Sequence, residues 1–317
     1  MKLITAQPSN QVDRSAGNGG DAVGTALEFR RPGTFSPIRD MEGGGPFHLR
    51  PGQWTDDTSM ALCLAASLVE RGWDPADQMR RYVRWRRDGY MSCTGVCFDI
   101  GSATAAALDR FERSGEPFSG SADPFTAGNG SLMRLAPVAM AHAFDAELAI
   151  ERSGNSSRTT HAAAAAVDAC RYFAGRLVGA LNGASRGDLL TPLYAPIPGY
   201  WRHRPLFPEI AEVAGGSFLR RDPPQIQGSG FVVRSLEAAL WAFHRSASFE
   251  EAVLNAANLG NDADTTAAVC GQIAGAYYGA AAIPERWLQR LAMSQEIETL
   301  AARLLELACA GRRRLRT

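Results

Sequence analysis

The 317-residue sequence has no long hydrophobic run, few alternating polar and apolar stretches, and only five histidines. No run of about 18 apolar residues is present that would cross a membrane. Residues 1–8 lack the apolar core of a secretory signal peptide. Lys plus Arg and Asp plus Glu each number 33, so the net charge is zero and nothing global indicates a polyanionic partner. We therefore expect a cytoplasmic protein that binds neither a membrane nor nucleic acid, and we take it to be a monomer.

Several kinds of catalytic motif are also missing. The six cysteines are scattered, which indicates reduced thiols rather than a disulfide framework, and Cys93 and Cys97 lack the partner pair of a zinc site. There is no phosphate-binding lysine loop and no GxGxxG after a strand, which argues against ATP chemistry and a Rossmann domain. No Ser-His-Asp or Cys-His arrangement favours a covalent hydrolase.

What the sequence does contain is alanine-rich helical periodicity, which predicts an all-α protein with a single domain. The expected organisation is an N-terminal segment (1–12), a domain (13–311) and a basic tail (312–317). The short polar stretch before Gly20 predicts a first helix that is weak or absent. Proline and glycine predict loops over 31–53 and 183–230. Helices are expected over 58–71, 75–87, 101–113, 132–143, 146–152, 160–182, 234–245, 249–257, 265–281 and 296–311.

An acidic pair, Asp262 and Asp264, stands at the start of the small-residue helix expected over 265–281. Side chains of this type are favoured at helix N-termini because their oxygens accept the free backbone N–H groups of the first turn. One acid would suffice for that purpose. Two acids concentrate negative charge in an apolar environment, which is tolerable when a hard cation lies between their oxygens.

A second acidic pair, Asp56 and Asp57, repeats the pattern before the helix expected over 58–71, and Glu28 lies in another apolar, glycine-spaced segment. For either pair alone, a capping role and a metal role are about equally plausible. If the segments converge, five carboxylates meet, and their repulsion would destabilise the fold or raise their pKa values. Two divalent cations, Mg²⁺ or Mn²⁺, would cancel most of this charge, so we infer a binuclear site.

Three further stretches carry polar chemistry with weaker signals. The turn Gly128–Arg134 opens a helix, and its free N–H groups are suited to a phosphate or diphosphate. Asp99 lies among apolar residues before another helix, and its spacing alone favours an N-cap. His161 is interpreted either as a capping residue or as a ligand contact.

Taken together and in order, these motifs resemble the ADP-ribosylglycohydrolase family, whose bacterial type member removes ADP-ribose from an arginine of dinitrogenase reductase. The resemblance covers roughly residues 13–290. It is carried by Gly20–Gly24 with Glu28, Trp54–Thr58, Gly95–Gly101, Gly128–Arg134, Thr160–His161, Asn258–Thr265 and Ile283–Trp287.

The resemblance implies a compact all-α helical bundle with a binuclear Mg²⁺ or Mn²⁺ centre at the bottom of a cleft. By position, the metal ligands would be Thr55, Asp56, Asp57, Asp262, Asp264 and Thr265. Glu28 would be a ligand or the general acid/base, and Asp99 would face the arginine guanidinium. The ADP-ribose contacts would be Gly101, Asn129, Gly130, Ser131, Met133 and His161.

The expected function is therefore metal-dependent hydrolysis of the N-glycosidic bond of ADP-ribosyl-arginine on a protein. The cations would orient and polarise the sugar while a carboxylate moves the proton. Two alternatives stay open. The same fold would serve ADP-ribosyl-serine, O-acetyl-ADP-ribose or another ribosyl compound, or the protein would be a non-catalytic crystallin-like relative or a toxin-neutralising binder.

Overall fold

The computed structural model describes residues 16–314, and within that range the chain forms helices, loops and isolated bridges but no strand. The all-α prediction is confirmed. The predicted segment 1–12 and residues 315–317 lie outside the described range. The helices are α1 (Ala16–Gly24), η1 (Thr25–Leu27), α2 (Asp56–Arg71), α3 (Pro75–Asp88), α4 (Ser102–Ser114), η2 (Pro124–Thr126), α5 (Ala136–Ala141), α6 (Ala146–Thr160), α7 (Ala164–Leu181), α8 (Arg186–Leu189), α9 (Tyr200–His203), α10 (Pro208–Ala214), η3 (Ser217–Leu219), α11 (Val232–Arg245), α12 (Phe249–Ala257), α13 (Ala263–Tyr278), η4 (Ala280–Ala282), α14 (Glu285–Leu288) and α15 (Ser294–Arg314).

Several expectations about helix boundaries were wrong. The helix expected over 146–152 continues to Thr160 as α6. The first helix is present as α1. The helix expected over 160–182 is interrupted at His161, which ends α6 and precedes α7. The helix expected from 132 starts only at Ala136, because residues 128–134 form the glycine-rich turn. The C-terminal helix α15 also continues to Arg314, into the region expected to be a tail.

Helix α13 lies at the centre, and every residue from Ala263 to Gly275 is buried. Its small side chains allow α1 to approach it closely. A Cβ atom at Gly20 would come within 2.2 Å of the Ala267 carbonyl oxygen, and one at Gly24 within 2.4 Å of the Ala263 carbonyl oxygen. Glycine at these positions therefore brings the backbone of α1 against the start of α13, where the acidic pair Asp262 and Asp264 lies.

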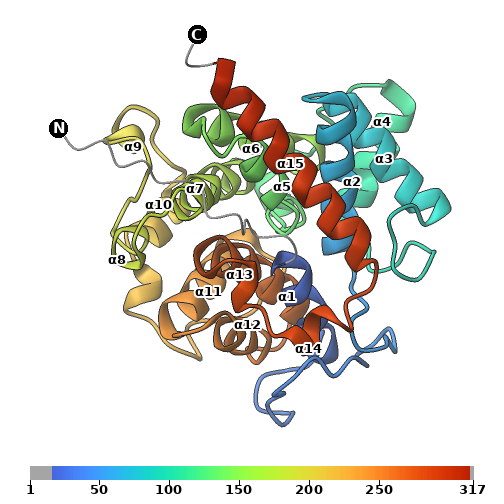
Figure 1. Cartoon of the computed structure of the whole chain (residues 1–317), viewed down its shortest axis with the longest axis vertical. Coiled ribbons are helices and arrows are strands. Elements are labelled where there is room, and N and C mark those ends of the chain that lie inside the picture. The colour runs from blue at the N-terminus through green and yellow to red at the C-terminus, as the bar shows by residue number, and fades with distance from the viewer. Residues whose placement is uncertain (1–15, 315–317) are drawn as a thin grey trace.

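Around this centre, α11 and α12 pack on α13, α7 packs on α13 and α6, and α15 crosses α2 and α5 (Figure 1). The short helices α8, α9 and α10 lie in the region 183–230, on the side of the molecule away from α2 to α4 (Figure 1). No helix in the described range is long and apolar enough to cross a membrane.

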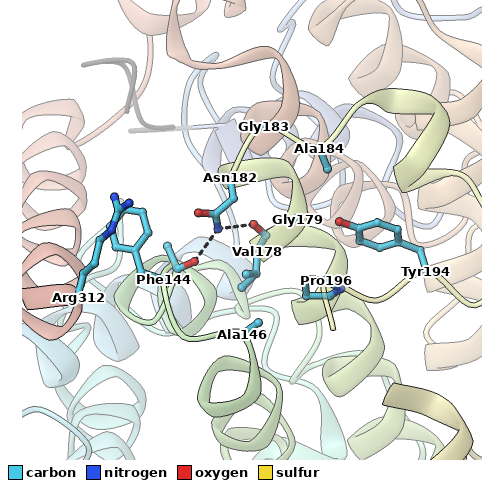
Figure 2. A pocket seen from close by; sticks show the side chains of 11 residues that line it. Phe144, Ala146, Val178, Gly179, Asn182, Gly183, Ala184, Tyr194, Pro196 and Arg312 are labelled. Carbon is cyan, nitrogen blue, oxygen red and sulfur yellow. Dashed lines mark hydrogen bonds between the residues drawn. The ribbon is translucent and has the colours of Figure 1, made fainter. Parts of the chain in front are cut away.

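A cavity of about 510 Å³ lies where the end of α7 meets the loop between α5 and α6 and the end of α15 (Figure 2). Asn182 donates to the carbonyl oxygens of Ala143 (2.6 Å) and Val178 (2.8 Å), which ends α7 against that loop. The Arg312 guanidinium lies 4.7 Å from the centre of the Phe144 ring. Arg312 and Asn182 therefore join the ends of α15 and α7 to the loop between α5 and α6.

Candidate metal centre and active site

The two acidic helix starts predicted from the sequence meet in space. Carboxylate oxygens of Asp21, Asp57 and Asp264 lie within 4.8 Å of one another, as do those of Glu28, Asp262 and Asp264. These residues come from α1, the end of η1, α2 and α13. The convergence assumed for the binuclear site is therefore present, with Asp264 shared by both groups.

Asp21, which sequence reasoning did not select as a site residue, holds the start of α2. Its carboxylate accepts the backbone N–H groups of Thr55 (3.0 Å) and Thr58 (3.0 Å) and both threonine hydroxyls, at 3.0 and 2.7 Å. Thr55, the N-cap of α2, makes no capping bond with its own side chain. The cap of α2 therefore comes from α1. The sequence feature that could have identified Asp21 is its position as a second acid in the same apolar, glycine-spaced segment as Glu28.

Glu28 caps the start of α13 in the same way as Asp21 caps α2. Its Oε2 atom accepts the backbone N–H groups of Ala263 (2.8 Å) and Asp264 (3.3 Å), while the N-cap residue Asp262 makes no side-chain capping bond. Asp264 Oδ1 accepts the Thr265 N–H at 2.7 Å, but the other N–H groups described here are capped from outside the two helices. A simple N-cap role therefore does not account for the two acidic pairs.

The remaining ligand candidates hold one another in place. The Thr55 hydroxyl also lies 3.0 Å from Asp264 Oδ2, and the Thr265 hydroxyl donates to Asp57 Oδ1 at 3.2 Å. Asp262 Oδ2 accepts from the Asn129 side chain at 3.0 Å. Asp56 is buried but belongs to neither of the two carboxylate groups.

Burial and mutual repulsion raise the pKa values of five acids of this site, namely Asp21, Glu28, Asp56, Asp57 and Asp262. Burial, followed by the charge of Asp264, raises the pKa of Asp21 to about 7, against the lowering effect of its threonine hydrogen bonds. The same two causes raise the pKa of Asp262 to about 7 and of Glu28 far above its usual range. The pKa of Asp57 is raised by burial and Asp264, and that of Asp56 by burial and Asp99.

The donor set fits hard divalent cations. It consists of carboxylate and hydroxyl oxygens, and no ion pair among residues 16–314 includes any of the clustered acids. Asp57 Oδ2 is fully buried and accepts no hydrogen bond in the described part of the chain. A buried carboxylate oxygen without a donor is costly unless a cation is bound to it.

Asp99 lies beside the cluster rather than at a helix start. The N-cap of α4 is Gly101, and Asp99 has a left-handed backbone with φ of 60°, so the N-cap interpretation was wrong. Burial, followed by the charges of Asp264, Asp21 and Asp262, raises the pKa of Asp99 to about 9. Gly101, expected to contact the substrate, is exposed.

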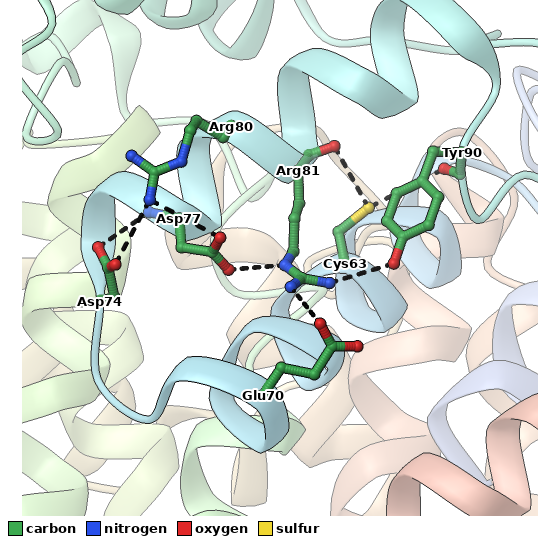
Figure 3. Close-up of polar contacts among 7 residues, drawn as sticks. All are labelled: Cys63, Glu70, Asp74, Asp77, Arg80, Arg81 and Tyr90. Carbon is green, nitrogen blue, oxygen red and sulfur yellow. Dashed lines mark hydrogen bonds and ion pairs between the residues drawn. The ribbon is translucent and has the colours of Figure 1, made fainter.

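The loop that carries Asp99 is anchored by Arg81 (Figure 3). The Arg81 guanidinium donates to Asp77 (2.6 Å) and Glu70 (2.7 Å), and it also donates to the Tyr90 hydroxyl at 3.2 Å. This one side chain ties α2 and α3 to the start of the loop over residues 89–101.

The glycine-rich turn borders the cluster on another side. Asn129 donates to Asp262 as described and to the Ser235 hydroxyl at 2.7 Å. Gly130 is half-buried. The Ser131 hydroxyl faces the Ser157 hydroxyl at 2.8 Å, and Met133 packs in the hydrophobic core. A substrate contact of Ser131 or Met133 stays a prediction, and for Ser131 the backbone N–H is the atom available to make it.

His161 lies against this turn as a neutral donor. A side chain at Gly128 or Gly130 would come within 3.3 Å of its Nε2 atom. Thr160 Oγ1 accepts from Arg134 at 2.8 Å and lies 2.8 Å from His161 Nδ1. An arginine only donates, so the Thr160 hydroxyl keeps its own proton for a bond to Nδ1, an arrangement that leaves the His161 proton on Nε2. Burial, followed by the charge of Arg134, lowers the pKa of His161 to about 3.

Arg134 was quoted in the turn motif but not selected as a site residue. It is fully buried and also donates to the Gly130 carbonyl at 2.5 Å. Its ring partner is Tyr82, 4.8 Å from the guanidinium carbon. The only sequence feature that could have identified Arg134 as a site residue is its position at the end of a glycine-rich turn.

Comparison with known proteins places this site in a family. The family model for ADP-ribosylglycohydrolase matches residues 16–314. The ADP-ribosylarginine hydrolase Tri1 of Pseudomonas putida is 44% identical over 97% of this chain and 82% of its own length. The ADP-ribosyl-[dinitrogen reductase] glycohydrolase of Rhodospirillum rubrum is 31% identical over 88% of each. A solved structure titled ADP-ribosylglycohydrolase-related protein complex matches with a TM-score of 0.82 and 44% identity, covering 93% of this chain and 98% of that one. The chain belongs to the ADP-ribosylglycohydrolase family.

Proposed function

We propose that this protein hydrolyses the N-glycosidic bond between ADP-ribose and an arginine side chain of a protein, with two divalent cations, Mg²⁺ or Mn²⁺. The observation that carries the proposal is the position of Asp99 beside the acid cluster, in a chain 44% identical to an ADP-ribosylarginine hydrolase. A carboxylate beside the reaction centre is suited to a cationic guanidinium, whereas a serine hydroxyl or an acetyl ester offers no charge for it to match.

The cations would be held at the starts of α2 and α13, with Glu28 next to them. The ligands there would be Thr55, Asp56, Asp57, Asp262, Asp264 and Thr265. When bound, the cations would supply Lewis acidity at the ribose hydroxyls. The hydrogen bonds of Glu28 in the described residues fall on Oε2. Oε1 is therefore the atom that takes a proton from water or gives one to the leaving nitrogen.

The residues of the glycine-rich turn would bind the diphosphate. Backbone N–H groups at Gly130 and Ser131 suit an anion. His161 adds a neutral Nε2–H donor, because its pKa of about 3 keeps the ring uncharged at neutral pH. The buried Arg134 lies behind this turn and contributes positive potential there.

The test is ADP-ribose release from an arginine-ADP-ribosylated protein, with Mg²⁺ or Mn²⁺ and then with EDTA. Wild type runs beside Asp262→Asn and beside Asp88→Asn, a matched change at an exposed acid at the end of α3. We expect metal-dependent release by wild type and Asp88→Asn, and at least a 100-fold loss in Asp262→Asn.

Two results would contradict the proposal. Absence of release despite tight binding of free ADP-ribose would exclude the arginine linkage and favour serine or acetyl-ester substrates. Release that persists in EDTA after exhaustive dialysis would exclude the cations.

A further inference from the structure

Three phenylalanine rings form a continuous row that connects three separate segments. The Phe29 and Phe47 rings are 6.3 Å apart between centroids, and the Phe47 and Phe98 rings are 5.2 Å apart. Phe29 follows η1, Phe47 belongs to the loop over 31–53, and Phe98 belongs to the loop over 89–101. Phe29 is 62% exposed, and the other two rings are half-buried. We call these three residues the phenylalanine row.

Each end of the phenylalanine row adjoins an acid of the site. Phe29 directly follows Glu28, whose carboxylate holds the start of α13. Phe98 directly precedes Asp99, whose pKa is raised by burial and by the charge of Asp264. Each end of the row is thus one residue away in the sequence from an acid of the site.

Folding alone does not account for Phe29. Its φ of 60° is in the left-handed region, which is unfavourable for a bulky residue. This backbone is held by hydrogen bonds from the Phe29 N–H to the Asn261 carbonyl (2.6 Å) and from the Asn261 N–H to the Arg30 carbonyl (2.7 Å). A residue that is both strained and exposed contributes little to stability, and such residues concentrate at functional sites.

We propose that the phenylalanine row binds the arginine side chain to which ADP-ribose is attached. This proposal rests on the proposed function and names the part of the substrate that gives specificity. A guanidinium is planar, cationic and weakly hydrated, so it stacks on aromatic faces, and its methylenes pack on apolar surface. The carboxyl group of Asp99, next to Phe98 in the sequence, would pair with its positive charge. Phe29, Phe47 and Phe98 are then specificity-determining residues that leave the ADP-ribose contacts unchanged.

The experiment measures binding in the Glu28→Gln background, in which the proposed function expects turnover too slow to consume the ligand during the measurement. Dissociation constants of free ADP-ribose and of ADP-ribosyl-arginine are compared with and without Phe98→Leu. We expect about a 5- to 30-fold weaker affinity for ADP-ribosyl-arginine, which is the range of a partly desolvated cation–π contact. The affinity for free ADP-ribose is expected to change by less than about twofold.

A second variant, Phe29→Asn, separates recognition from packing, because Asn tolerates the left-handed backbone. We expect its melting temperature to equal or exceed that of the parent while its affinity for ADP-ribosyl-arginine falls. Leu193→Asn is the matched control: Leu193 is also apolar, is 50% exposed and has a φ of 55°, but it lies between α8 and α9. It should leave both affinities unchanged.

Three results would overturn the inference. The first is an unchanged affinity for ADP-ribosyl-arginine in both phenylalanine variants. The second is an equal loss for ADP-ribose and ADP-ribosyl-arginine, which would assign the row to the nucleotide. The third is a lower melting temperature of Phe29→Asn without an affinity change, which would make the row a packing element. Failure of the proposed function is distinguished by hydrolysis: the wild-type enzyme would then not cleave ADP-ribosyl-arginine at all.

Discussion

Helices of this protein start in two different ways. At α3, α6 and α12 the N-cap residue uses its own side chain: Asp74, Asp145 and Ser248 each accept a backbone N–H from their own first turn. At α2 and α13 the N-cap side chains make no such bond, and carboxylates of Asp21 and Glu28 accept those N–H groups instead. The capping carboxylates at α2 and α13 thus come from other elements, which leaves most oxygens of the first-turn acids free for the proposed cations.

The largest expected effect comes from changing Glu28, which has both a capping and a proposed catalytic role. In Glu28→Gln the amide oxygen still accepts from Ala263, but the side chain no longer transfers a proton. We expect kcat to fall by about 10²- to 10⁴-fold with little change in melting temperature. Glu28→Ala should lose as much activity and, in addition, about 1 kcal/mol of stability because the cap is gone. Near-normal turnover by Glu28→Gln on an arginine-ADP-ribosylated protein would leave Glu28 with the cap alone.

Removing the cations should make the stability of the whole protein strongly dependent on pH. Asp21 and Asp262 have pKa values raised from 3.8 to about 7 in the folded state, and that of Asp99 is raised to about 9. The folded protein therefore binds more protons than the unfolded chain at intermediate pH. Stability from these groups is fully present below about pH 4 and is lost as the pH rises through about 7 and then 9, by roughly 1.4 kcal/mol for each pKa unit.

The measurement is the melting temperature between pH 5 and 9, in EDTA and in excess Mg²⁺ or Mn²⁺. In EDTA it should fall with rising pH, and with the metal this fall should be reduced or reversed, because cations bind the deprotonated acids. Identical profiles in both buffers would be incompatible with a cation in the acid cluster. Other titrating groups are common to both buffers, so the difference between the curves is the quantity to compare.

Asp21→Asn changes the cap of α2 without touching the acids of that helix. One carboxylate oxygen is replaced by an amide nitrogen, so the N–H and hydroxyl groups of Thr55 and Thr58 share one acceptor oxygen instead of two. We expect Mn²⁺ affinity to fall by about 10- to 100-fold, as for other residues that orient metal ligands. Titration with Mn²⁺ measures this. A lower melting temperature with unchanged Mn²⁺ affinity would make Asp21 a cap and nothing more.

The sequence was sufficient for most of the helices and for recognising the two acidic helix starts. Helical periodicity is a local property, and ten expected helices correspond to α2–α7, α11–α13 and α15 to within a few residues, except at the end of α6. That the acids converge was assumed from the sequence and is shown only by the structure. The charge argument gave the consequence, because several buried carboxylates of like charge are tolerated only together with cations or protons.

Residues whose role depends on distant partners were not identified in this way. The bonds of Asp21 reach residues 34 and 37 positions away, and nothing near Asp21 in the sequence reveals them. Asp99 has the local pattern of an N-cap, and only its distance from Asp264 in space gives it another role. The break at His161 was missed because alanine-rich residues follow it directly, while its bridge to Ser121 is a tertiary contact.

The smallest effect is expected at the self-capped helices, and it provides the baseline for the comparison. Asp74→Ala removes the acceptor of the Asp77 N–H (2.9 Å), and Ser248→Ala removes that of the Glu251 N–H (3.1 Å). Each should lower the free energy of unfolding by about 1 kcal/mol, measured by urea denaturation. Mn²⁺ affinity and turnover should stay within about twofold of wild type, because neither cap touches the acid cluster. The α12 variant is the more demanding control, since α12 packs directly on α13. If Ser248→Ala weakened Mn²⁺ binding as much as Asp21→Asn, any loosening of the bundle would reach the metal centre, and the external cap of α2 would have no special role in positioning it.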